Sequence, residues 1–140
     1  MRRLKTVSRL ALLGAALVAV IAGVHFQQHV DFISEVPTVG VLFLLNAAGG
    51  AGLALALLSS DRVLRLLAAV GSIGLAAGSL ISIFIALQGS FFGYREPTLR
   101  LPIVIAILAE AAAIPVLVAL LRQHLGPASR RGAPAGRAAS

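Results

Sequence analysis

The sequence predicts an all-α fold, a four-helix transmembrane bundle with both termini in the cytoplasm and a short disordered basic tail at the C-terminus. Hydrophobic residues make up 59% of the chain and charged residues only 12%, whereas a soluble domain carries about 25% charged residues. A soluble chain of this length could not bury so much apolar surface. Four apolar stretches have the length of about 20 residues that a helix needs to cross a hydrocarbon core.

The first span is expected over residues 7–24, directly after a basic N-terminal segment. A basic start, an apolar core and small residues near Ala22 are also typical of a cleaved signal peptide. We favour an uncleaved first helix, and cleavage would leave the orientation of the other spans unchanged.

The second and third spans are expected over residues 38–58 and 63–87, and the fourth over residues 99–121. Each must be an α-helix, because lipid offers no hydrogen-bond partner to an exposed backbone. The spans form one domain, residues 1–122. Residues 123–140 are rich in Gly, Ala, Pro and Arg without apolar periodicity, which is typical of a disordered segment.

The orientation follows from the positions of the twelve lysines and arginines. All but Arg95 and Arg100 lie in the N-terminus, in the link between the second and third spans, or at and beyond the end of the fourth span. Because Lys and Arg favour the cytoplasmic side, we expect a multi-pass protein of the cell membrane with both termini in the cytoplasm. The net charge of +7 does not indicate nucleic-acid binding, since these residues flank the spans and form no single patch.

Glu110 is the only residue between Leu101 and Leu121 that can carry a charge. A charge near the bilayer midplane costs about 2.5–3.5 kcal/mol on insertion scales, so we expect Glu110 to be largely protonated at neutral pH. Asn46 of the second span and Ser79 and Ser82 of the third lie at a matching depth. The sequence therefore predicts an intramembrane polar layer of Glu110, Asn46, Ser79 and Ser82, to which the first span contributes nothing.

Two interpretations of this polar layer stay open. It can be an interhelical clasp in which each hydrogen bond is worth about 0.6 kcal/mol. Alternatively, Glu110 is a stopping point for protons or cations in a transport path, since an ionisable residue inside the membrane is a functional candidate.

The segment "HFQQHVDF" places His25 and His29 four residues apart, on one side of a helix if the first span continues that far. Two imidazoles at this spacing can share a metal ion or respond to pH. Two solvated histidines at the membrane interface are the simpler alternative. No cofactor is expected.

The chain contains no cysteine, which excludes disulfides and thiol chemistry. It also lacks the HExxH, GxSxG and phosphate-binding glycine motifs. We therefore expect no enzymatic activity.

The segments "HFQQHVDFISEVPTVGVLFLLNAAGG" and "GSFFGYREPTLRLPIVIAILAEAAAI" resemble those of small four-helix integral membrane proteins of actinobacteria. The likeness covers most of residues 10–121 and excludes the tail. It implies the four-helix architecture and an actinobacterial host. It assigns no activity, and no residue receives a role from it.

We therefore expect a small non-enzymatic integral membrane protein, a structural or accessory component of a membrane complex. Its expected partners are the lipid bilayer and either further copies of itself or a larger complex. One alternative is an oligomeric carrier of protons, cations or small solutes that uses the polar layer. Another is an outer-face metal or pH sensor at His25 and His29.

Overall fold

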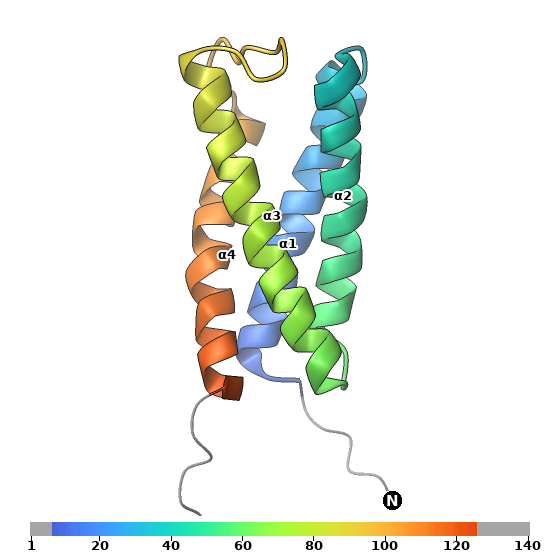
Figure 1. Cartoon of the computed structure of the whole chain (residues 1–140), viewed down its shortest axis with the longest axis vertical. Helices are drawn as coiled ribbons and strands as arrows, with labels where there is room; N and C mark the ends of the chain where they lie inside the picture. Colours follow the sequence, from blue (N-terminus) through green and yellow to red (C-terminus); the bar gives the residue numbers. More distant parts are fainter. Residues whose placement is uncertain (1–6, 126–140) are drawn as a thin grey trace, which may run out of the picture.

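A computed structural model describes residues 7–125 and confirms the all-α, four-helix prediction. Within that part, the chain forms four α-helices and no strand (Figure 1). Each helix is long and apolar enough to cross a membrane. The helices are α1 (Arg9–Gln28), α2 (Pro37–Leu57), α3 (Arg62–Gln88) and α4 (Leu101–Leu125). The predicted disordered tail, residues 123–140, falls outside the described residues except for its first three.

Local sequence signals explain where three of the helices begin. The Ser8 hydroxyl accepts a hydrogen bond from the Ala11 amide at 3.2 Å, and the Asp61 carboxylate accepts one from the Leu64 amide at 2.8 Å. These side chains satisfy amides that have no partner within the first helical turn. Pro37 occupies the first turn of α2, where its missing N–H costs no hydrogen bond.

The first helical segment extends well past residue 24, where the predicted span ends. After Gln28, the backbone continues as one π-helical turn, η1 (His29–Ile33), before the short link to α2. The polar residues that follow Val24 therefore stay helical, and His25 and Gln28 face the interior of the bundle. The other three predicted spans differ from the observed helices by only a few residues.

The helices run alternately up and down (Figure 1). The start of α1, the α2–α3 link and the end of α4 lie at one end of the bundle, which we call the inner end. The η1 segment and the 89–100 connection lie at the other, outer end.

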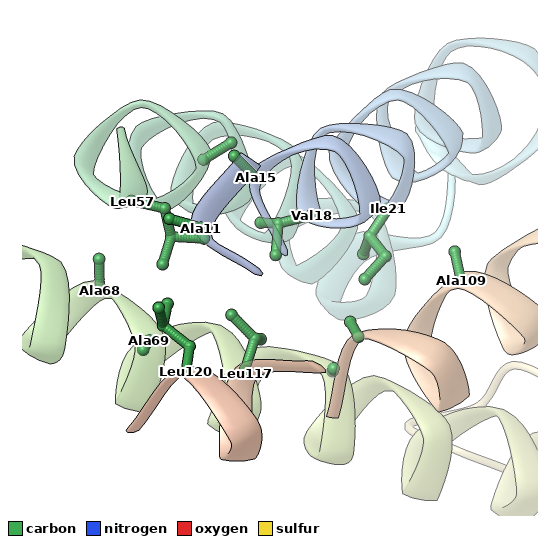
Figure 2. Packing of buried hydrophobic residues seen from close by; sticks show 13 residues of the cluster. Ala11, Ala15, Val18, Ile21, Leu57, Ala68, Ala69, Ala109, Leu117 and Leu120 are labelled. Carbon is green, nitrogen blue, oxygen red and sulfur yellow. The ribbon is translucent and has the colours of Figure 1, made fainter. Parts of the chain in front are cut away.

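Small and branched apolar residues pack the inner half of the bundle (Figure 2). Val18, Leu117 and Leu120 are fully buried there among alanines of all four helices. Helix α1 approaches α4 closely at Gly14, where a Cβ atom would lie 2.9 Å from Leu117 Cδ2. Many large apolar side chains point outward instead, among them Leu55, Leu67, Leu101 and Leu108. Apolar exposure on this scale is compatible with helices that face lipid.

Candidate functional site

Three helices bring ionisable and polar side chains together in the outer half of the bundle. His25 of α1 is 4% exposed and Glu110 of α4 is 1% exposed. Their atoms Nε2 and Oε1 are 4.0 Å apart. The Ser79 hydroxyl of α3 lies 3.0 Å from the same His25 Nε2. An imidazole, a carboxyl and a hydroxyl thus meet at one buried point.

The hydrogen bonds define which tautomer a neutral His25 adopts. Its Nδ1 lies 2.9 Å from the Ile21 carbonyl oxygen, which can only accept, so Nδ1 carries a hydrogen. In the neutral ring, Nε2 is then an acceptor. Ser79 consequently donates its hydroxyl hydrogen to Nε2, and the Ser79 oxygen keeps its lone pairs for another donor. The α1 backbone thus fixes which imidazole nitrogen faces Glu110.

These groups line a cavity of about 40 Å³, which we call the polar cavity. Its polar lining consists of His25, Gln28, Ser79, Glu96 and Glu110, while α2 contributes the apolar Phe43. Both amide atoms of Gln28 and the Glu110 Oε1 are buried without a hydrogen-bond partner. Because a water molecule needs about 10–15 Å³ and at least two polar partners, this volume can hold water between these groups.

Glu96 forms the outer end of the polar cavity and is held by three hydrogen bonds. It accepts one from the Tyr94 hydroxyl at 2.5 Å and two from Arg100, at 3.0 Å and 3.2 Å. The Arg100 guanidinium also lies over the Phe32 ring, 4.5 Å from its centroid. Glu96 is buried, so these contacts compensate for a charge that would otherwise be buried alone.

The same contacts perturb two groups of the 89–100 connection. The pKa of Tyr94 is raised to about 12, mainly by burial and secondly by the hydrogen bond to Glu96. The hydrogen bonds to Glu96 raise the pKa of Arg100 above its ordinary value. Tyr94 therefore remains a donor, and Arg100 a cation, at every physiological pH.

Tyr94 can be titrated without interference, because it is the only tyrosine and the chain has no tryptophan. Ultraviolet absorbance should report tyrosinate formation with a midpoint near 12, compared with about 10 for a free side chain. The Glu96→Gln variant should titrate closer to 10. The stability that this bond contributes should be complete below about pH 10 and lost as the pH rises through the folded-state pKa. A wild-type midpoint equal to that of Glu96→Gln would contradict the assignment.

The structure brings together only part of the predicted polar layer. Glu110 and Ser79 share the polar cavity. Asn46 and Ser82 line a different cavity between α2 and α3, and Ser82 donates to the Gly78 carbonyl of its own helix at 2.8 Å. The expectation that the first span contributes nothing is wrong, because His25 of α1 lies 4.0 Å from Glu110.

A sequence signal for the missed residues exists in α1. Val18, Ile21, His25 and Gln28 recur at helical spacing and form one buried stripe. His25 and Gln28 therefore continue the core-facing side of a helix that does not end at Val24. Glu96 has no comparable signal, because it follows a helix and lies in an irregular connection.

The two histidines predicted as a metal pair have different partners. The His29 Nδ1 donates to the Gly40 carbonyl at 2.9 Å, whereas His25 faces Ser79 and Glu110. Within residues 7–125, no group of three or more His, Cys, Asp or Glu side chains is placed to hold a metal ion.

Comparisons with protein-family models, with curated proteins and with solved structures gave no match. The His25–Ser79–Glu110 site is where ionisable groups meet inside the bundle.

Proposed function

We propose that the chain is an integral membrane protein that crosses the bilayer four times, with both termini in the cytoplasm, and that it carries protons, or a solute together with protons, by way of His25 and Glu110. The four long apolar helices and the distribution of lysine and arginine support the membrane placement. The observation that carries the proposal is the buried approach of His25 and Glu110 beside polar atoms without partners.

The unpartnered atoms favour transport over a purely structural clasp. A clasp gains stability from satisfied hydrogen bonds, and each buried unsatisfied group costs about 1–3 kcal/mol. Gln28 and Glu110 instead present free polar atoms to a cavity. Unpartnered polar atoms suit a site that exchanges water or protons, because the hydrogen bonds of such a site must form and break during each transport cycle.

The geometry supports a simple proton transfer. With both groups neutral, Glu110 carries a proton and His25 Nε2 carries a lone pair. The separation of 4.0 Å exceeds a direct hydrogen bond, so one hydroxyl must lie between them. Either Ser79 or a cavity water can accept the Glu110 proton while it gives its own to Nε2. The products are a glutamate and an imidazolium, and the pair titrates as one coupled unit.

Access to the pair is asymmetric. The polar cavity extends from Glu110 to Glu96, next to the 89–100 connection at the outer end. Toward the inner end, Leu117 and Leu120 are fully buried in the apolar core. A full transport cycle therefore requires the inner half to open. Pro115 provides a place for α4 to bend, because it leaves the Ala111 carbonyl without its helical donor.

Liposomes that contain the purified protein and a pH-sensitive dye test this proposal. Under an imposed potential, we expect wild-type proton flux to exceed that of protein-free liposomes. Glu110→Gln and His25→Gln should each reduce it by at least about tenfold, because each removes a group that binds the proton. Glu35→Gln and His29→Gln are matched controls outside the polar cavity and should retain full flux. Equal flux in all four variants would refute the proposal.

A role as a subunit of a membrane assembly is a second candidate. An apolar groove between α1 and α2 is lined mainly by Ala and Gly, including Ala48 and Ala51, and small residues let a neighbouring helix approach closely. Because the chain has no cysteine, Ala51→Cys adds a unique thiol. Disulfide cross-linking between copies in the membrane should occur at Ala51→Cys and be absent at Val70→Cys, an exposed position on α3. The reverse pattern would exclude self-association through this groove.

A further inference from the structure

A second, larger cavity of about 330 Å³ lies between α2 and α3, and we call it the side cavity. Its size falls within the range of about 300–1,000 Å³ that is typical of small-molecule sites. The two helices approach each other at the inner end and diverge toward the outer end (Figure 1). Phe91, Phe92 and Tyr94 of the 89–100 connection line the side cavity at its outer end.

The lining of the side cavity is largely apolar with a few polar groups. Leu42, Phe43 and Ile83 contribute apolar surface, and the Phe43 ring lies 4.9 Å from that of His25. The polar contributors are His25, Asn46, Ser79, Ser82 and Tyr94. The lining contains no Asp, Glu, Lys or Arg side chain. This composition suits an uncharged, lipid-soluble molecule with a small polar head group.

The hydrogen-bond roles around Ser79 define which head group fits. Ser79 uses its hydrogen toward His25 Nε2 and so offers only lone pairs to a ligand. The Asn46 carboxamide also lines the cavity and can both donate and accept a hydrogen bond. A hydroxyl group can donate to Ser79 and accept from Asn46, whereas a ketone or an ether cannot donate at all.

Two glycines of α3 keep this space open. Gly74 and Gly78 line the side cavity, and a Cβ atom at either position would meet nothing within 4 Å. A larger side chain there would extend into free volume without striking the protein. Replacement of either glycine by a larger residue should therefore fill part of the side cavity without disturbing the fold.

We propose that the side cavity binds an uncharged, lipid-soluble molecule with a hydroxyl head group, which donates to Ser79 while the apolar part lies between α2 and α3. This inference rests on the proposed function, since it places the site in the bilayer beside the proton-binding pair. His25, Phe43, Ser79 and Ile83 line both cavities. The bound hydroxyl would thus be connected to His25 through Ser79, by two successive hydrogen bonds, next to the groups that handle the proton.

Photolabelling with a long-chain alcohol that carries a diazirine tests the binding. In lipid nanodiscs, labels located by mass spectrometry should concentrate on α2 and α3 around Leu42–Asn46 and Gly78–Ile83, and excess 1-dodecanol should suppress them. Gly78→Leu and Gly74→Leu should lower this labelling by at least about tenfold, because they fill the volume that the apolar part needs. Gly52→Leu is the matched control, because a Cβ atom at Gly52 also meets nothing within 4 Å, and Gly52 lines neither the two cavities nor the groove between α1 and α2.

Two further comparisons make the outcomes distinct. The same diazirine chain with a methyl ether in place of the hydroxyl should label weakly, and equal labelling by both probes would overturn the hydroxyl assignment. Undiminished labelling in both Gly78→Leu and Gly74→Leu would overturn the site itself. Glu110→Gln should keep the labelling while it loses proton flux, so failure of the ligand site and failure of the proton site can be told apart.

Discussion

Replacement of Arg100 by alanine should lower the free energy of unfolding by about 3–5 kcal/mol, the cost of breaking a buried ion pair by removing one partner. The Glu96 side chain is 1% exposed and that of Arg100 is 27% exposed. The variant therefore leaves a buried carboxylate with Tyr94 as its remaining side-chain donor. The contact between Arg100 and the Phe32 ring is lost as well. Denaturant titration in micelles, followed by circular dichroism, measures the change.

Arg95→Ala provides the control for this prediction. Arg95 is exposed in the same connection, so its replacement should change stability by no more than about 0.5 kcal/mol. The double variant Arg100→Ala/Glu96→Leu should recover much of the loss, because it removes the unpaired charge together with its partner. If Arg100→Ala and Arg95→Ala unfold at the same denaturant concentration, the contacts of Glu96 with Arg100 contribute nothing to the stability of the bundle.

Replacement of Gly40 by valine should destabilise the protein by about 3 kcal/mol, the upper end of the usual cost of overpacking. A Cβ atom at Gly40 would lie 2.6 Å from the Ile33 carbonyl oxygen and 3.2 Å from that of Ser34. Both neighbours belong to the backbone, so no rotamer change relieves the clash. The η1 segment would have to move and disturb the hydrogen bond from His29 to the Gly40 carbonyl.

Gly49→Val is the matched control for Gly40→Val. Both positions lie in α2, so the intrinsic helix preference of valine over glycine is the same in each. A Cβ atom at Gly49 meets nothing within 4 Å, and this variant should unfold within a few degrees of wild type in a thermal scan. Equal melting temperatures for the two variants would show that η1 does not pack against α2 as described.

The fold could be predicted from sequence to a large extent, because the two ends of a long apolar run mark approximately where a helix that crosses lipid begins and ends. Glu110 could also be identified, since a single acid inside such a run requires a partner. Counting residues from the helix ends placed Ser79 at the correct depth. The same counting placed Asn46 beside Glu110, yet Asn46 lines the side cavity instead. Counting residues gives the depth of a side chain along the axis of the bundle. The direction in which that side chain points depends on how the helices pack.

The missed part of the site has two physical origins. His25 reaches Glu110 because α1 continues beyond the apolar run, and composition alone places the end of a span where polarity begins. Glu96 becomes buried only because the 89–100 connection folds back. Its amide donates to the Ala86 carbonyl of α3 at 3.0 Å, and its side chain meets Arg100 and Tyr94. Contacts of an irregular connection depend on tertiary packing and leave no periodic pattern in the sequence.

The central claim is that Glu110 holds an exchangeable proton beside His25 inside the bundle. Infrared spectroscopy of the protein in lipid tests it directly, because a protonated carboxyl group has its own C=O stretching band. We predict such a band in the wild type, its loss in Glu110→Gln, a displaced band in His25→Gln and an unchanged band in His29→Gln. A wild-type spectrum that matches Glu110→Gln across this region, or a Glu110 band that does not respond to His25→Gln, would contradict the account.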